Sequence, residues 1–369
     1  MLSLLTTPAA LAALRADPAP LFETVFAAAH AAIAAAFTEA STAAGYAVSR
    51  AAEGYLVRKR AGNVFCVHGG STATVVAILD GRRVVCANVG DSGALLCGGA
   101  GAPPVELRPA EEWTPLEPAA ASPAPSGSGA GSEGGPDAAG DAGGAAGDAA
   151  GGGGGAPAAP FFALELTTDH TPESAEEFTR VAAARPSASG ARGMPDALFV
   201  YDVLSVAKAA CPGIFELRGG APVKTGRGSY YKNVRSEWAT LVATPPHAAF
   251  QDALAFTRSL GDFHLQSYGV AHAPAVRWAA LPARGAGAGA GAHALALVLA
   301  SDGLWDNWLP ADVAAAALAP RSLAAARAAD APAVQAAVDA LLDANLARAA
   351  ANFGDSADNM TVLVAWLVE

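Results

Sequence analysis

The sequence predicts an α+β protein in which helices pack outside a core of two antiparallel β-sheets. Three observations predict this class: two apolar runs joined by a hairpin signal, a second pair of strand-like runs near the C-terminus, and long segments with apolar residues at helical spacing. A chain of 369 residues has room for one large domain or two ordinary ones.

The first strands are expected at residues 72–79 and 84–89, because Asp80-Gly81 between them is a strong hairpin signal. Each run is rich in β-branched and other apolar residues, which suits a strand that is buried on at least one face. Four later runs of the same kind are expected to be strands: residues 94–96, 161–166, 295–300 and 360–367.

Helices are expected where apolar residues recur every three or four positions. Residues 21–37 and 332–351 show this spacing along one face, and residues 174–184 have acidic residues near the start, as the helix dipole favours. Pro310 begins another, Ala-rich helix, because proline is well suited to the first turn.

Residues 118–160 consist mainly of Gly, Ala, Pro and Ser, and such a segment cannot bury enough apolar surface to offset its ordering entropy. They are expected to form a disordered insertion. Strand signals on both sides place it within one sheet, so residues 1–369 are predicted to form a single domain. Residues 193–246 are aromatic and turn-rich without clean periodicity, which favours a flap-like surface subdomain.

Composition narrows the class of partner. The net charge of −11 argues against nucleic acid or an anionic membrane as the main partner, since both attract clustered Lys and Arg. No secretory signal and no apolar run of spanning length is recognised, so we expect the protein in the cytoplasm, with the nucleus as a second location. We also expect it to be a monomer. The cysteines form no metal-binding pattern and are expected to be free thiols: Cys66, Cys86, Cys97 and Cys211.

Three aspartates lie where predicted strands meet tight turns: Asp91, Asp302 and Asp358. Asp302 follows the strand at residues 295–300, and Asp358 precedes the strand at residues 360–367. If these two strands are antiparallel neighbours, both carboxylates lie at the same edge of the sheet. Hard oxygen ligands on short side chains are what Mg²⁺ and Mn²⁺ require, so the sequence predicts a metal site at this edge.

Six segments in order resemble the motifs of the metal-dependent protein serine/threonine phosphatases of type 2C, also called the PPM family. Each segment alone is weak, because Ser-Asp-Gly is also ordinary turn chemistry, but their common order makes chance similarity improbable. The segments are Gly70-Ser71-Thr72-Ala73, residues 87–92 (Ala-Asn-Val-Gly-Asp-Ser), residues 166–172 (Leu-Thr-Thr-Asp-His-Thr-Pro), residues 255–263 (Ala-Phe-Thr-Arg-Ser-Leu-Gly-Asp-Phe), residues 300–306 (Ala-Ser-Asp-Gly-Leu-Trp-Asp) and Asp358-Asn359-Met360-Thr361.

The resemblance implies an αββα sandwich and a centre of two Mn²⁺ or Mg²⁺ ions. It also implies a metal-activated water that attacks the phosphorus of phosphoserine or phosphothreonine in phosphorylated protein substrates. Asp302 and Asp358 match ligands of the core metal pair. Asp91 and Asp306, together with Asp302, match a third and looser metal site found in some members.

The first signature of that family is missing. Members carry a phosphate-binding Arg, an acidic pair and an Asp-Gly-His-Gly-Gly segment before the first long helix, and this chain has no Asp-Gly-His. The sandwich is therefore expected to be incomplete at its N-terminal side. No residue is assigned as catalytic or substrate-binding, and metal affinity is expected to be weak because one bridging carboxylate is lacking.

Three functions stay open from the sequence. The chain is a phosphatase by family, or a catalytically impaired pseudophosphatase that binds phosphoproteins or partner proteins as a regulatory module. A different metal-dependent hydrolase that uses the same carboxylates is the third.

Individual side chains also have alternatives. The four aspartates can be turn formers or caps, and Arg258 with Asp262 is expected to form an internal ion pair. Four cations of the flap-like region are expected to be solvated, with attraction of a phosphorylated substrate as the alternative: Lys208, Lys224, Arg227 and Lys232.

Overall fold

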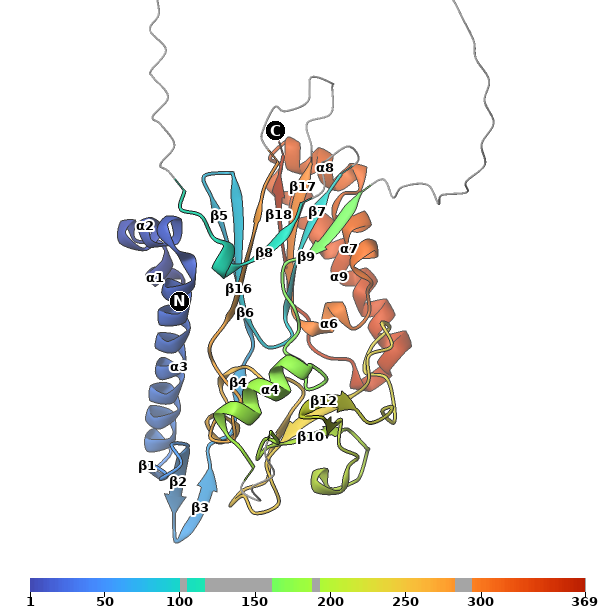
Figure 1. Ribbon diagram of the computed structural model, residues 1–369. Helices are drawn as coiled ribbons and strands as arrows, with labels where there is room; N and C mark the ends of the chain where they lie inside the picture. The colour runs from blue at the N-terminus through green and yellow to red at the C-terminus, as the bar shows by residue number, and fades with distance from the viewer. Residues whose placement is uncertain (100–104, 117–160, 188–192, 283–293, 369) are drawn as a thin grey trace, which may run out of the picture.

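The protein is described by a computed structural model that covers residues 1–99, 105–116, 161–187, 193–282 and 294–368. Two four-stranded antiparallel sheets lie face to face, with helices on both outer faces, which confirms the predicted αββα sandwich (Figure 1). The predicted disordered insertion, residues 118–160, lies outside the described residues. The predicted division into one domain with a flap-like part stays a prediction.

The first sheet contains the predicted hairpin. Its strands, in spatial order, are β5 (Ala73–Leu79), β6 (Arg83–Val89), β16 (Ala275–Ala280) and β8 (Leu107–Pro109). Asp80 and Gly81 connect β5 to β6 with positive φ angles of 52° and 63°, as a tight hairpin turn requires. Pairing then runs from Leu79 opposite Arg83 to Ala73 opposite Val89.

The second sheet holds the two C-terminal strands side by side. In spatial order it consists of β18 (Val362–Leu367), β17 (Leu295–Ala300), β7 (Gly93–Gly98) and β9 (Phe162–Glu165). β17 is antiparallel to both of its neighbours. Ala300, its last residue, lies opposite Val362 of β18 and opposite Gly93 of β7. The expectation that the two strands are antiparallel neighbours is therefore confirmed.

Apolar side chains form three layers around these sheets. Between the sheets, residues of β6 and β7 such as Cys86 and Leu96 pack on Leu297 of β17. Helix α3 (Pro18–Ala43) covers the first sheet, and α7 (Pro310–Ala317) with α9 (Ala331–Phe353) covers the second. The short helices are α1 (Leu2–Leu5), α2 (Pro8–Ala16), α5 (Phe263–Gln266), α6 (Asp302–Trp305) and α8 (Pro320–Arg327). All four cysteines are buried free thiols, as predicted.

Helix α3 is longer than its apolar stripe predicts. Asp17 caps it by accepting a hydrogen bond from the Ala19 N–H, and Pro18 fills its first position. By length and composition this helix is apolar enough to cross a membrane, so the expectation that no segment approaches that length is wrong. Its fully buried Phe22 and Phe26 pack on the first sheet, although only 17% of the apolar window of the helix is buried. The absence of a membrane partner and the cytoplasmic location stay predictions.

Two groups of short strands were not predicted. The first is an antiparallel sheet of β1 (Ala47–Arg50), β2 (Leu56–Arg60) and β3 (Asn63–Cys66). The second lies beyond the open end of the sandwich beside α4 (Ala175–Ala184) (Figure 1). It contains β10 (Leu198–Tyr201), β11 (Phe215–Arg218), β12 (Ala221–Lys224), β13 (Thr240–Ala243) and β14 (Ala253–Leu254). A two-stranded pair, β4 (Gly70–Ser71) and β15 (Leu260–Gly261), joins this region to the first sheet.

Candidate metal centre

The register of the second sheet brings the predicted aspartates to one edge. Asp302 follows the end of β17, Asp358 precedes β18, and Asp91 lies in the turn between β6 and β7. Because Ala300 pairs with both Val362 and Gly93, these three chain segments meet at the same end of the sheet. Asp306 follows one helical turn after Asp302, and its N–H donates to the Asp302 carbonyl oxygen at 2.7 Å.

Backbone contacts fix the two loops that carry Asp302 and Asp358. The Gly303 N–H donates to Asp302 Oδ1 at 2.9 Å, and the Asn359 N–H donates to Asp358 Oδ1 at 2.7 Å. Each carboxylate thus has one oxygen held by its own loop, with the second oxygen available for a ligand. Ser301 and Thr361 tie the loops together, because the Ser301 N–H donates to the Thr361 carbonyl oxygen at 3.1 Å.

The four aspartates differ in their exposure to solvent: Asp91 is buried, Asp302 and Asp306 are half-buried, and Asp358 is exposed. Burial, followed by the nearby Asp302 carboxylate, raises the pKa of Asp91 to about 7, and only 8% of Asp91 is exposed. Burial and then Asp358 raise the pKa of Asp302, while burial raises that of Asp306 to about 6. In the described part of the chain, no Lys or Arg lies within ion-pair distance of any of the four. A cation is the missing partner that this arrangement favours.

The donor chemistry fits Mg²⁺ or Mn²⁺, since both prefer carboxylate oxygens. The number of donors fits one weakly held ion. Within the described residues, no three His, Cys, Asp or Glu side chains gather as a ready metal site. Mg²⁺ is commonly held by one or two carboxylates and several waters, so Asp302 and Asp358 suffice for that mode. A closed two-metal centre is not formed by these side chains.

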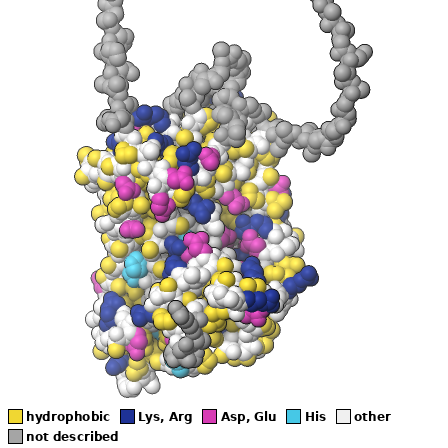
Figure 2. Space-filling view, viewed as in Figure 1, with side chains coloured by type: hydrophobic (Ala, Val, Ile, Leu, Met, Phe, Trp, Pro, Cys, Tyr) yellow, Lys and Arg dark blue, Asp and Glu magenta, His cyan; other side chains and the backbone are white. Residues whose placement is uncertain are grey.

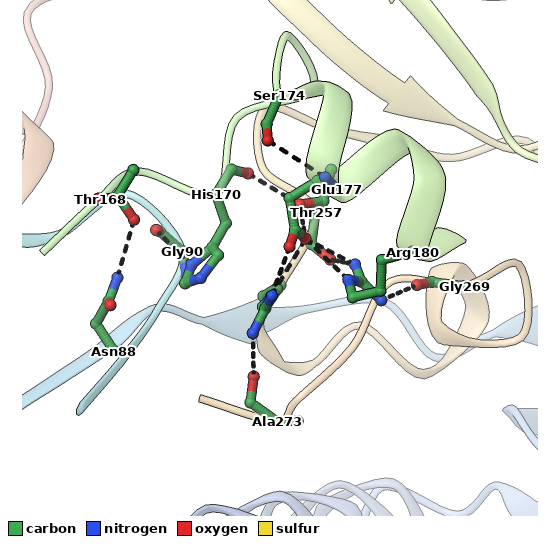
Figure 3. A network of polar contacts seen from close by, with 11 residues as sticks. Asn88, Gly90, Thr168, His170, Ser174, Glu177, Arg180, Thr257, Gly269 and Ala273 are labelled. Carbon is green, nitrogen blue, oxygen red and sulfur yellow. Dashed lines mark hydrogen bonds and ion pairs between the residues drawn. The ribbon is translucent and has the colours of Figure 1, made fainter. Parts of the chain in front are cut away.

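A buried polar network holds the Asp91 turn against α4 (Figure 3). Gly90, next to Asp91, donates its N–H to His170 Nδ1 at 3.1 Å. The His170 carbonyl oxygen accepts from the Thr257 N–H at 2.7 Å, and Thr257 Oγ1 donates to Glu177 Oε2 at 2.6 Å. Burial lowers the pKa of His170 to about 4, so its ring is neutral and acts as an acceptor here. His170 therefore positions the turn that carries Asp91.

The expected ion pair between Arg258 and Asp262 is not the one that forms. Arg258 Nη2 donates instead to Glu177 Oε1 at 2.5 Å, and Arg180 Nη2 donates to Glu177 Oε2 at 2.8 Å. Asp262 has a left-handed φ of 44° and donates its N–H to the Gly69 carbonyl oxygen. The pairing of Glu177 with Arg258 was not predicted, because Arg258 lies 81 residues away along the chain.

The four cations of the flap-like region behave differently from one another. Lys224 pairs with Glu173 at 3.0 Å and Lys208 pairs with Asp202, both at the surface, and Arg227 is exposed, in line with the solvated interpretation. That interpretation is wrong for Lys232, whose side chain is only 21% exposed. Burial alone would lower the pKa of Lys232, but the negative charges of Glu237, Asp169, Asp91 and Asp306 outweigh burial and raise it.

Glycine at position 303 is required by the packing of the two loops. A Cβ atom there would lie 2.4 Å from the Asn359 carbonyl oxygen, which is backbone and cannot move aside cheaply. We expect Gly303→Ala to lower the free energy of unfolding by about 1–3 kcal/mol. It should also weaken Mn²⁺ binding, because the Asp302 and Asp358 loops are pushed apart. Urea denaturation and calorimetric Mn²⁺ titration measure the two effects.

The matched control is Gly226→Ala, since a Cβ at Gly226 meets nothing within 4 Å. It should leave both quantities unchanged. Equal losses in the two variants would contradict the role of the Gly303–Asn359 contact.

The fold is an αββα sandwich, and the chain segments that carry the aspartates meet at one edge of its second sheet. The resemblance of the sequence motifs implies this architecture. A family model described as Protein phosphatase 2C matches residues 33–106, from the second half of α3 through β7. The match supports the predicted resemblance to the protein phosphatase 2C family over that part of the chain, which is less than half of it. No curated protein matches the sequence.

Among solved structures, a serine-threonine phosphatase 2C from Toxoplasma gondii is similar, with 15% sequence identity and a TM-score of 0.40. The similarity covers 85% of this chain and 58% of that one, so the chain spans little more than half the length of this relative. Similarity at this level does not itself assign an activity.

Proposed function

We propose that this chain is a metal-dependent protein phosphatase that acts on phosphoserine and phosphothreonine in protein substrates. The observation that supports the proposal most directly is the convergence of Asp302 and Asp358, each at the end of a neighbouring strand. The family match over residues 33–106 supports the same reaction class.

In this proposal Asp302 and Asp358 hold one Mn²⁺ or Mg²⁺ ion with their free carboxylate oxygens. When bound, such an ion supplies an acidified water and stabilises negative charge on a phosphoryl group. Asp302 carries the larger role, because, besides burial, its charge raises the pKa of Asp91 and the charge of Asp358 raises the pKa of Asp302 itself. The backbone N–H of Gly303 keeps the Asp302 carboxylate oriented.

The second candidate is a catalytically impaired relative that binds phosphoproteins or partner proteins. It is favoured by the small number of donors, since within the described residues no three His, Cys, Asp or Glu side chains gather as a ready metal site. The partners proposed for both functions are phosphorylated proteins. On the face shown in Figure 2, Lys and Arg lie interspersed with Asp and Glu, which does not favour nucleic acid.

Hydrolysis of a phosphoserine peptide, with Mn²⁺ and with a chelator, tests the proposed activity. We expect slow hydrolysis that depends on Mn²⁺ and a Mn²⁺ affinity weaker than the sub-millimolar range, because two carboxylates must compete with water for the ion. Binding of the phosphopeptide without any turnover would favour the pseudophosphatase. Tight binding of two ions per chain would contradict the argument for a weak single site.

A further inference from the structure

A cavity of about 270 Å³ lies between the C-terminal end of α3 and the strands β2 and β3. These strands lie beside the end of the long helix and away from α6, which carries Asp302 (Figure 1). A cavity of roughly 150 Å³ can hold benzene, so this one has room for a small molecule. Its lining consists of Phe37, Ala40, Ala44 and Val67 on the apolar side and Ser41, Arg58, Cys66 and His68 on the polar side.

Two polar side chains of the lining are short of partners. Arg58 Nε is buried and has no hydrogen-bond partner. Ser41 is 7% exposed, and its hydroxyl makes no hydrogen bond within the described residues. Buried polar groups normally have a partner, either in the protein or in a bound molecule. Both donors are therefore available to a ligand in this cavity.

Arg58 also lacks a counter-ion. Its Cζ lies 4.9 Å from the centre of the Tyr46 ring, a contact that holds the guanidinium in place, but no carboxylate of the described chain lies within ion-pair distance of it. The carboxylate that pairs with the lining is Asp252, whose Oδ2 lies 2.8 Å from His68 Nδ1. The positive charge of Arg58 is thus left for another anion.

The small sheet that carries Arg58 is basic in an otherwise acidic chain. Residues 47–66 contain four cations and one acidic residue, Glu53, whereas the whole chain has a net charge of −11. None of the four has a carboxylate within ion-pair distance in the part of the chain that the structure describes: Arg50, Arg58, Lys59 and Arg60. A cluster of unpaired cations around a cavity attracts anions to it.

We propose that this cavity binds the oxyanion group of a small molecule with an apolar body, the group being a phosphate or a carboxylate. A guanidinium donates two parallel hydrogen bonds to either group, and the Ser41 hydroxyl supplies a further donor. Phe37 and Val67 would cover the apolar body. None of the lining residues belongs to the segments that carry the four aspartates, so the site does not depend on the proposed phosphatase activity.

Calorimetric titration of the full chain with phenylphosphonate in metal-free buffer tests the site, because this anion is not hydrolysed. Benzoate is the carboxylate probe, and benzyl alcohol is the neutral one. We expect phenylphosphonate or benzoate to bind and benzyl alcohol not to bind, and the tighter anion identifies the group. Inorganic phosphate should bind more weakly, because it leaves Phe37 and Val67 uncovered. Failure of both aromatic anions to bind overturns the proposal.

Arg58→Gln should lower the affinity for the anion by about 10–100-fold, since hydrogen bonds to a charged group are lost. Lys59→Gln is the matched control. It removes the same charge from the next residue of β2, which is exposed and lies on the opposite face of the strand, and it should change the affinity little. Equal losses in the two variants would mean diffuse attraction and would overturn the assignment to the cavity.

Ala40→Leu provides a second test that keeps the charge of Arg58. Ala40 is exposed on α3 and lines the cavity, and leucine is a strong helix former, so the variant should fold and fill the space. It should abolish binding of phenylphosphonate. Binding that persists unchanged in folded Ala40→Leu overturns the proposal, even if Arg58→Gln fails to fold. Hydrolysis of a phosphoserine peptide should be the same in all three variants.

Discussion

Asp302→Asn is expected to abolish Mn²⁺-dependent hydrolysis of a phosphoserine peptide. The substitution keeps the shape of the side chain and removes the negative charge that a divalent ion would need at this position. Loss of a group that merely supports a metal ligand lowers affinity or activity about 10–100-fold, so loss of the ligand itself should lower activity by at least on the order of 100-fold. Initial rates at saturating Mn²⁺, together with the Mn²⁺ dissociation constant, measure the effect.

Asp343→Asn is the matched control, because Asp343 is an exposed aspartate on α9 away from the sheet edge. It should retain full activity and full Mn²⁺ affinity. If Asp302→Asn keeps the same activity as Asp343→Asn, the assignment of the site to this edge is wrong, and another metal-dependent hydrolase mechanism becomes the better explanation.

Glu177→Gln should be the most destabilising of the proposed substitutions. Burial alone would raise the pKa of Glu177, but hydrogen bonds from Arg258 and Arg180 outweigh it and lower the pKa to about 2, from an ordinary value of 4.5. The ionised form therefore contributes about 3 kcal/mol to the free energy of unfolding near pH 7. Removing the charge leaves two guanidinium groups without their buried partner, which is expected to cost a similar amount.

The stabilisation by ionised Glu177 should decrease as the pH falls. Because the folded-state pKa is depressed, the stabilisation is fully present above about pH 4.5 and is lost as the pH falls towards 2. The stability difference between the unaltered protein and Glu177→Gln should shrink over that window, as urea denaturation at several pH values can measure. Glu176→Gln, one residue earlier and exposed, is the control and should change little. A difference that persists unchanged down to pH 2 would rule out the charge as its origin.

Local patterns were enough to predict most of the sandwich. The alternation and the Asp80-Gly81 turn fixed the β5–β6 hairpin, because both strand and turn are encoded by neighbouring residues. Helix α9 followed from its apolar spacing in the same way. The short strands β1, β2 and β3 were missed, since segments of four or five residues give no alternation long enough to stand out.

The charged partners could not be predicted from the sequence. Arg258 pairs with Glu177, which is 81 residues away, whereas the expected Asp262 was close in sequence and faces elsewhere. Nothing near Lys232 in the chain distinguishes it from Lys224, which is exposed. Contacts between distant segments distinguish them: the Val234 N–H donates to the Asp306 carbonyl oxygen and Lys232 is only 21% exposed, whereas Lys224 pairs with Glu173 at the surface.

Strand ends and turns are local properties, so the sequence predicts that Asp302 and Asp358 share a sheet edge if their strands are antiparallel neighbours, and the structure forms that pairing. The ordered motifs also predict the resemblance to the protein phosphatase 2C family, whose model matches residues 33–106. What surrounds those carboxylates depends on the tertiary structure: how deeply Asp91 is buried and how many donors gather among the described residues. These features depend on contacts between distant segments, whose energies no local pattern records.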